Sequence, residues 1–365
     1  MLAAYHAGKP ARTPVCLGTS TRFFMFNNPG ANPAGVEFKE YFENPDLMFD
    51  LQLQFQRWRQ FNLLQDDELG LPEKWTVRVD FQNFHEAAYF GCPIEFMPGQ
   101  VPDARSAFAD APEKVMEHGI PDPFGGVMAR ARRYYEHFKN RAAAETFLER
   151  PIEVAPGFIF PEGPFTLACG LFGTDVACVM MIEEPDRYRA LLDFLVTSMI
   201  GRMKAWRELC GVPADTNFWY ADDSIAMIST EMFREFVLPD HRRMCEVFDN
   251  GKPRSIHLCG DATRHFPMLQ KELNVQSFDT GFPVDFGAVR RALGPGAEIL
   301  GGPHVELLLS ATPGQVREEV RRIMESGILE GGKFILREGN NLAPGTPLEN
   351  TEAMYHAGRE FGVRG

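Results

Sequence analysis

Short apolar runs alternate with segments of helical periodicity along the C-terminal two-thirds of the chain. The runs are rich in aromatic and β-branched residues, which is typical of strands, whereas the segments repeat apolar positions every three or four residues, which is typical of helices. We expect strands at residues 157–160, 217–220, 254–257, 275–278, 298–300 and 333–336. Helices are expected from about 175, over 186–209, from 230, through 240 to 248, over 264–273, between 279 and 298, over 313–325, and from about 348.

Six strand–helix units in series, with no long Gly/Ser linker between them, predict a parallel sheet. Because the alternation continues over this length, a closed TIM (β/α)8 barrel is favoured over an open doubly wound sheet. Residues 13–18 predict the first strand, and residues 30–123 carry the other early strands with insertions rich in Phe and Pro. The pattern therefore predicts an α/β protein of one domain, residues 1–365, that folds as a TIM barrel with N-terminal insertions.

The balance of charges excludes several classes of partner. The chain has 37 basic and 50 acidic residues, for a net charge of -13, and no long basic run. Phosphate contacts need clustered Lys and Arg, so nucleic acid is not expected as a partner. Net acidity does not suit a membrane surface, no segment has the apolar length of a membrane span, and no signal peptide is expected. The seven cysteines are scattered singly, which fits a reducing cytoplasm.

Polar residues that can carry chemistry lie at or just after the ends of the predicted strands. They are Glu162, Asp222, Asp223, His257, Cys259, Asp279, His304 and Asn340. In a barrel the carboxyl ends of the strands open on one mouth, where active sites are found. Asp and Asn after a strand are also ordinary turn and helix-cap residues, so any one of them alone is better explained by structure. The whole set, with its histidines and its cysteine, favours a functional mouth.

The triplet His257-Leu258-Cys259 is the most specific signal in this set. If the run before it is a strand, alternation places the His and Cys side chains on the same side. An imidazole and a thiol side by side form half of a zinc site. A coordinating thiol is deprotonated at neutral pH, and the thiolate is the nucleophile.

Other motifs are weaker. Neither a Gly-x-Ser-x-Gly elbow nor a His-Glu-x-x-His helix is present, and Gly301-Gly302-Pro303 lacks the spacing of a nucleotide-binding loop. His85-Glu86 could serve acid–base chemistry, but we interpret it as a pair on a helix surface. None of these motifs competes with the triplet.

The last part of the chain carries a block with a familiar pattern. Residues 334–350, Phe-Ile-Leu-Arg-Glu-Gly-Asn-Asn-Leu-Ala-Pro-Gly-Thr-Pro-Leu-Glu-Asn, resemble the last barrel strand and the following helix entry of the uroporphyrinogen decarboxylase superfamily. Other segments similar to that family are 163–168, 222–223, 229–239, 257–260, 279 and 301–302. The resemblance runs from about residue 157 onward and implies a TIM barrel. The superfamily contains true decarboxylases and zinc-dependent corrinoid and coenzyme M methyltransferases.

The resemblance to the true decarboxylases breaks at three positions. Their N-terminal arginine motif, which suits an anionic substrate, is replaced by residues 16–22, in which Arg22 is the one arginine. Their catalytic Asp falls on Gln82, with Asp80 two residues earlier, and their late His falls on Asn340. A decarboxylase reading would give the catalytic role to Asp80 and the anchoring role to Arg22.

The resemblance to the methyltransferases is closer and also incomplete. Those enzymes hold zinc with His-x-Cys and a distant Cys, and His257 and Cys259 match the first part. The distant Cys falls on Asn340, and an amide oxygen is a poor third ligand beside nitrogen and sulfur donors. The residues that could complete the site are His304, Glu162, Asp223 and Cys169. His304 is the first choice, although a helix N-terminal histidine bonded to its loop is an equal alternative.

The leading functional hypothesis is a zinc-dependent methyltransferase. It would move a methyl group between a corrinoid or a methylated small molecule and a thiol or corrinoid acceptor. Asp222 and Asp223 would position the substrate or orient a ligand, with Asp279, Glu162 and Asn340 also at the site. The corrinoid would arrive on a partner protein, because no separate corrinoid domain is visible. A decarboxylase is the alternative enzyme, and a barrel that binds a small molecule without turnover is the third hypothesis. The resemblance also suggests a homodimer.

Overall fold

The computed structural model describes residues 1–23, 32–67 and 69–363. The chain forms two compact units. Unit 1 consists of residues 1–36, 51–73 and 255–365, and unit 2 consists of residues 37–50 and 74–254. Helix α4 (Pro45–Asn62) contains one of the points at which the chain passes from unit 2 to unit 1.

Unit 1 is built on parallel strands that alternate with helices. In their order across the sheet, the strands of this unit are β10 (Phe334–Leu336), β9 (Glu298–Gly301), β8 (Val275–Thr280) and β7 (Arg254–Leu258). Val15 extends the sheet beyond β10 through a parallel bridge to Leu336. Along β7, Ile256 and Leu258 are buried, so the intervening His257 lies on the other face. The sheet thereby turns this histidine away from the apolar side of the strand.

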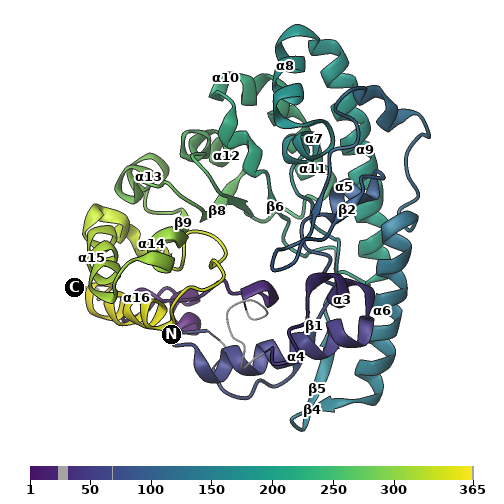
Figure 1. The fold of residues 1–365 in the computed structure, drawn as a ribbon. Coiled ribbons are helices and arrows are strands. Elements are labelled where there is room, and N and C mark those ends of the chain that lie inside the picture. Colours follow the sequence, from purple (N-terminus) through teal and green to yellow (C-terminus); the bar gives the residue numbers. More distant parts are fainter. Residues whose placement is uncertain (24–31, 68, 364–365) are drawn as a thin grey trace. The chain divides into compact units, whose positions relative to one another are not determined.

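Apart from α1 at the N-terminus, the helices of unit 1 alternate with or follow its strands in sequence. They are α1 (Leu2–His6), α12 (Phe266–Leu273), α13 (Phe286–Leu293), α14 (Val305–Ser310), α15 (Pro313–Ile323) and α16 (Leu348–Phe361). The helices α15 and α16 lie side by side, as Figure 1 shows. Helix α15 begins at a capping box in which Thr312 and Gln315 satisfy each other's backbone N–H groups. Its buried residues Val316, Val320 and Ile323 recur at helical spacing, which explains why periodicity identifies it.

Unit 2 contains two small sheets and the further short strand β6 (Trp219–Ala221). Strand β5 (Arg150–Val154) pairs in parallel with β1 (Trp75–Val77) and antiparallel with β4 (Thr146–Phe147). The short strands β2 (Ile94–Glu95) and β3 (Asp103–Ala104) form an antiparallel pair. Glu162 joins β6 (Trp219–Ala221) through a parallel bridge to Ala221. The polar residues that follow β6 are therefore held near the segment that contains Glu162.

Helices make up most of unit 2. They are α3 (Phe38–Glu43), α5 (His85–Tyr89), α6 (Gly126–Ala144), α7 (Pro164–Phe172), α8 (Thr174–Glu183), α9 (Pro185–Leu209), α10 (Thr230–Met232) and α11 (Leu238–Val247). The long helix α6 packs along β5 (Figure 1). In α9, buried residues recur every three or four positions from Tyr188 to Trp206, so one face of the helix forms part of the core.

Most of the predicted alternation is confirmed, and the misses have physical causes. Five of the six predicted strands are present with ends shifted by at most two residues. The strand predicted at 157–160 is wrong, because Phe158 has a φ of 57° and the segment is irregular. Residues 13–18 form a bridge rather than a full strand. Helix α7 was not predicted because it is apolar on nearly all sides and shows no periodicity.

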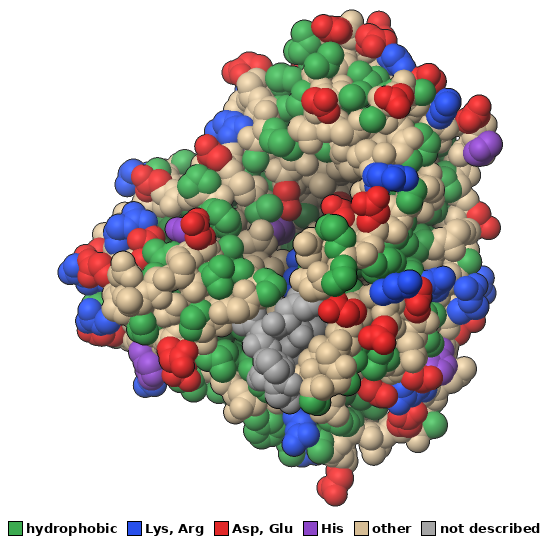
Figure 2. Space-filling view, in the orientation of Figure 1, with side chains coloured by type: hydrophobic (Ala, Val, Ile, Leu, Met, Phe, Trp, Pro, Cys, Tyr) green, Lys and Arg blue, Asp and Glu red, His purple; other side chains and the backbone are tan. Residues whose placement is uncertain are grey.

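The surface mixes charges and apolar groups. Figure 2 shows acidic and basic side chains interspersed over the face in view, with apolar side chains between them. Within residues 1–23, 32–67 and 69–363, no single helix is long and apolar enough to cross a membrane. The bent pair α7–α8 passes the same test by length and composition only, with an angle of 109° between its helices.

Candidate functional site

His257 and Cys259 lie together at the end of β7 in unit 1. Their ligand atoms are within 4.8 Å of one another, and both side chains are half-buried. Gly281 makes room for this arrangement, since a Cβ at that position would lie 2.4 Å from Cα of Cys259. Its N–H also donates to the carbonyl of Leu258 at 2.8 Å, which ties the loop after β8 to the end of β7. The structure thus confirms that the triplet brings the two side chains together.

The orientation of His257 is set by a charged pair formed by a residue of β8 and a residue that directly follows β10. Nδ1 of His257 lies 2.9 Å from Oδ2 of Asp279, which belongs to β8. Arg337, directly after β10, lies 3.0 Å from the same oxygen. A carboxylate that accepts from Nδ1 fixes the tautomer and the ring plane of a histidine ligand. Nε2 is then the nitrogen suited to a metal.

Behind Arg337 lies a carboxyl group that is closed off from solvent. Glu338 is 0% exposed, accepts the N–H of Gly18 at 3.1 Å, and has Oε1 at 3.8 Å from Arg337. Burial raises the pKa of Glu338 to about 7, although Arg337 opposes the shift. A Cβ at Gly18 would lie 1.8 Å from an Arg337 nitrogen, so this glycine allows the guanidinium its place. His257, Asp279, Arg337 and Glu338 therefore form one continuous polar chain.

The other predicted residues of unit 1 have local roles in the structure. His304 is the N-cap of α14, and its Nδ1 accepts the N–H of Leu307 at 3.4 Å. Asn340 has a φ of 141°, and its Oδ1 accepts the N–H of Asn341 at 2.8 Å. Arg22 is half-buried. The contact of His304 with Leu307 agrees with the alternative interpretation of this residue as a histidine that caps a helix. Its Nε2 takes no part in the cap.

Asp222 in unit 2 is a structural residue by its contacts. It is 0% exposed, and its Oδ1 accepts from the backbone N–H and the hydroxyl of Thr166, each at 2.7 Å. Its Oδ2 lies 2.7 Å from Nε2 of His241, which is also fully buried. A Cβ at Gly163 would lie 2.1 Å from Asp222, so glycine is needed there. Asp222 thus holds the start of α7 and is closed off from any substrate.

A second charged cluster in unit 2 surrounds Glu162. Glu86 is 1% exposed and lies 2.5 Å from Arg202, which is 0% exposed. Burial raises the pKa of Glu86, but Arg202 and His85 outweigh it and bring the value to about 2. Burial and the negative charges of Glu86 and Asp223 instead raise the pKa of Glu162 well above its usual range. The cluster therefore lowers the pKa of one carboxyl and raises the pKa of the other.

This cluster corrects the interpretation of His85-Glu86. The two residues begin α5, but Glu86 faces the core rather than the surface and forms a buried ion pair. The sequence gives no sign of this pairing, because Arg202 is 116 residues away on α9. Asp223 starts a short 3-10 helix and is half-buried, and Cys169 is buried within α7. Burial raises the pKa of the Cys169 thiol to about 12.

Asp80 is enclosed by local partners. Both of its carboxylate oxygens accept from Nε2 of Gln82, at 2.7 and 2.8 Å, and Oδ2 accepts from the hydroxyl of Tyr41 at 3.1 Å. Gln82 has a φ of 52°, which turns its side chain back on Asp80. Gln82, which stands at the position of the family's catalytic Asp, is thus hydrogen-bonded to Asp80, the other candidate for that role.

Sequence reasoning missed Arg337, Glu338, Arg202 and His241. Arg337 and Glu338 follow the strand at 333–336, so the same signal that selected Asn340 could have found them. Arg202 and His241 lie within helices, and no local pattern distinguishes a buried charged residue there from an exposed one.

Comparison with known proteins identifies the family. Residues 1–361 match the family described as Uroporphyrinogen decarboxylase (URO-D), and the chain belongs to this family. The methylated-thiol–coenzyme M methyltransferase of Methanosarcina mazei is 28% identical over 296 residues, which cover 78% of this chain and 72% of that protein. The uroporphyrinogen decarboxylase of Prochlorococcus marinus is 23% identical over 327 residues, covering 88% and 85%.

A solved structure agrees with this assignment. A methyltransferase from Methanosarcina mazei has a TM-score of 0.63 and 18% sequence identity, and covers 99% of this chain and 97% of its own. The fold is that of the family, an α/β TIM barrel, as the sequence predicts. Within this family, the chain is thus similar both to a methyltransferase and to decarboxylases.

Proposed function

We propose that this chain is a zinc-dependent methyltransferase in which His257 and Cys259 are metal ligands. The observation that carries the proposal is the pair itself, with ligand atoms within 4.8 Å, and the carboxylate of Asp279 on Nδ1 of the histidine. A nitrogen and a sulfur donor suit zinc, and a carboxylate behind the histidine is the usual support for such a ligand. The similarity to a methyltransferase over 78% of the chain adds to the proposal.

In this function the residues of unit 1 have separate tasks. His257 would bind zinc through Nε2 and Cys259 through Sγ, while Asp279 keeps the imidazole ring in place. Zinc, when bound, stabilises the thiolate form of a coordinating thiol, which is the nucleophilic form. Arg337 pairs with the same carboxylate oxygen of Asp279 that contacts His257, and so helps to hold this carboxylate in place.

The third ligand is proposed to be His304, as the sequence suggests. Its Nδ1 already caps α14, so coordination would use Nε2. Asp223 and Glu162 are the acidic alternatives, and an ionised carboxylate suits zinc better than the amide of Asn340. Burial raises the pKa of Glu162, which disfavours the ionised form that a metal ligand needs.

The substrates follow from the chemistry of the site and the name of the relative. Since that relative acts on a methylated thiol and coenzyme M, we propose a thiol as one of the two methyl carriers for this chain. A corrinoid bound to a partner protein would be the other carrier, as the superfamily resemblance implies.

Metal analysis of the purified protein tests the proposal. We expect about one zinc per chain, lost on either His257→Ala or Cys259→Ala, because removal of one ligand opens the site. His137→Ala and Cys178→Ala are matched controls, since they remove the same types of side chain from the helices α6 and α8, and they should keep the metal. Folded wild-type protein that takes up no zinc would refute the proposal. Zinc analysis of His304→Ala, Asp223→Ala and Glu162→Ala then identifies the third ligand.

A decarboxylase acting on a porphyrinogen or another carboxylic acid is the second candidate. The match to a uroporphyrinogen decarboxylase over 88% of the chain favours it. Asp80 would be the catalytic carboxylate and Arg22 the anchor. Carbon dioxide release from uroporphyrinogen, abolished by Asp80→Asn and retained in His257→Ala, would establish this function. Absence of zinc and of both activities would leave a barrel that binds a small molecule without turnover.

A further inference from the structure

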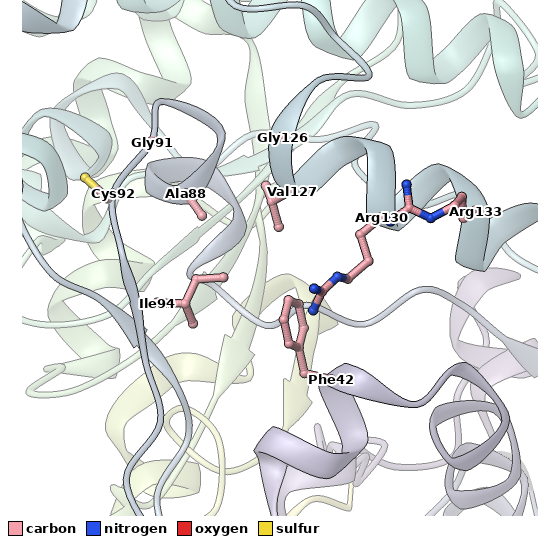
Figure 3. Close-up of a pocket in the computed structure, with 9 residues that line it drawn as sticks. All are labelled: Phe42, Ala88, Gly91, Cys92, Ile94, Gly126, Val127, Arg130 and Arg133. Carbon is pink, nitrogen blue, oxygen red and sulfur yellow. The ribbon is translucent and has the colours of Figure 1, made fainter.

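A cavity of about 360 Å3 in unit 2 is lined by apolar side chains, glycine backbone and two arginines (Figure 3). Phe42, Ile94 and Val127 supply its apolar walls, and Arg130 and Arg133 extend from α6. None of the residues that line it is acidic. A volume of this size and mixed lining is typical of small-ligand pockets.

The two arginines are the exceptions on their helix. Arg132 pairs with Glu136 at 3.0 Å, and Arg141 binds Glu145 at 2.8 Å. Arg130 and Arg133, by contrast, have no ion-pair or hydrogen-bond partner among the described residues. In a chain with 50 acidic and 37 basic residues, unpaired arginines that flank one cavity are notable. Arg130 is half-buried and Arg133 is exposed, so both guanidinium groups are accessible to an anion that enters the cavity.

The guanidinium of Arg130 is also held ready for an anion. Its central carbon lies 4.6 Å from the centre of the Phe42 ring, and Figure 3 shows the side chain extended toward that ring. Stacking on an aromatic face fixes the plane of a guanidinium while its N–H donors point outward along that plane. Such a fork binds a carboxylate or a phosphate with two parallel hydrogen bonds.

The two glycines that line the cavity, Gly91 and Gly126, have open space beside their backbone. A Cβ on Gly91 or Gly126 would meet no atom within 4 Å, so the glycines leave volume rather than close packing. An apolar body can therefore lie against Phe42, Ile94 and Val127 while an oxyanion meets the arginines.

We propose that this cavity binds a small amphipathic anion, with a carboxylate or phosphate on Arg130 and Arg133 and an apolar or aromatic body against Phe42. The proposal does not depend on the methyltransferase function, because none of its residues belongs to the zinc pair or its supports.

Calorimetric titration with 2-naphthoate, 2-naphthyl phosphate and the neutral 2-naphthamide tests this site. We expect both anions to bind and the amide to bind at least about tenfold more weakly, because it lacks the charge that the arginines recognise. The anion that binds more tightly shows whether carboxylate or phosphate is preferred. Binding should weaken as salt is added. Equal binding of naphthoate and naphthamide, or no binding of either anion at millimolar concentration, would overturn the proposal.

Variants locate the binding. Arg130→Gln should weaken naphthoate binding by at least about tenfold, whereas Arg132→Gln, which removes a paired arginine of the same helix, should leave it unchanged. Val127→Trp fills the cavity without removing charge and should abolish binding, which keeps the test valid if Arg130→Gln is unstable. Cys259→Ala should bind as the wild type does. Loss of binding in Cys259→Ala, with retention in Arg130→Gln, would place the probe elsewhere and refute the site.

Discussion

Oδ2 of Asp279 lies 2.9 Å from Nδ1 of His257, and the same oxygen lies 3.0 Å from Arg337. Asp279 of β8 thereby orients the imidazole of His257, and Arg337, which directly follows β10, holds the carboxylate of Asp279. The ring plane of His257 is thus fixed by residues that are distant in sequence. A metal ligand fixed in this way is preorganised before the metal binds.

Removing the carboxylate should therefore weaken metal binding without removing a ligand. In Asp279→Ala we expect zinc affinity to fall by about 10–100-fold, because the ring loses its orientation and its basicity. Competition with a chromogenic chelator measures the change. Asp285→Ala is the control, since Asp285 is an exposed N-cap on α13 and should leave affinity unchanged. Equal affinities of Asp279→Ala and the wild type would show that the carboxylate does not support a metal ligand.

A tight approach at Gly163 gives a prediction for stability. Because an added Cβ would lie 2.1 Å from Asp222, Gly163→Ala should displace a fully buried carboxylate and lower the free energy of unfolding by about 1–3 kcal/mol. Gly201→Ala is the matched control on α9, where a Cβ meets no atom within 4 Å. It should be neutral or stabilising by about 0.5–1 kcal/mol. Urea unfolding measures both, and equal effects would contradict the steric argument.

The sequence predicts the fold well where one local signal suffices. In β8, β9 and α15 the apolar residues recur at spacings typical of a strand or a helix, so the positions of these elements can be predicted from the pattern alone. His257 and Cys259 come together because alternation along one strand requires it. These successes depend on neighbours in sequence, for which simple geometry is enough.

The misses concern residues whose partners are distant in sequence. Asp222 was expected to position the substrate or orient a ligand, and the structure shows its carboxylate bonded to Thr166 and His241, contacts that have no local signature. Glu86 was taken for a surface residue because its partner, Arg202, is on another helix. Tertiary pairing decides whether a carboxyl is structural or functional, and a single sequence does not contain that information.

The buried pair of Glu86 and Arg202 should dominate local stability. Either Glu86→Gln or Arg202→Met leaves an uncompensated buried group, and we expect a loss of about 3–5 kcal/mol for each. The double variant should lose less than the sum, because neither charge is then left alone. Chemical unfolding of the four proteins in a double-mutant cycle measures the coupling. Strict additivity would show that the two groups do not interact.

This pair also sets an acid dependence. The pKa of Glu86 is lowered to about 2 in the folded chain, against about 4.3 for an unperturbed Glu. Its contribution is thus present above about pH 4.3 and is lost as the pH falls toward 2. The stability difference between the wild type and the double variant should shrink across this window. A constant difference from pH 5 to pH 2 would contradict the assignment.

Glu338 should show the opposite sign. Burial raises its pKa to about 7, so the folded chain retains a proton that the unfolded chain releases near pH 4.3. Stability from this group is therefore complete below about pH 4.3 and falls as the pH rises through 7, by about 3 kcal/mol in total. Glu338→Gln removes the titration but can still accept the N–H of Gly18. We expect the variant to match the wild type near pH 4.5 and to exceed it in free energy of unfolding by about 3 kcal/mol at pH 8. Glu352→Gln, at an exposed position of α16, is the control and should follow the wild type at every pH. Guanidinium unfolding at several pH values measures the curves, and a Glu338→Gln curve parallel to the wild type would show that Glu338 is ionised throughout.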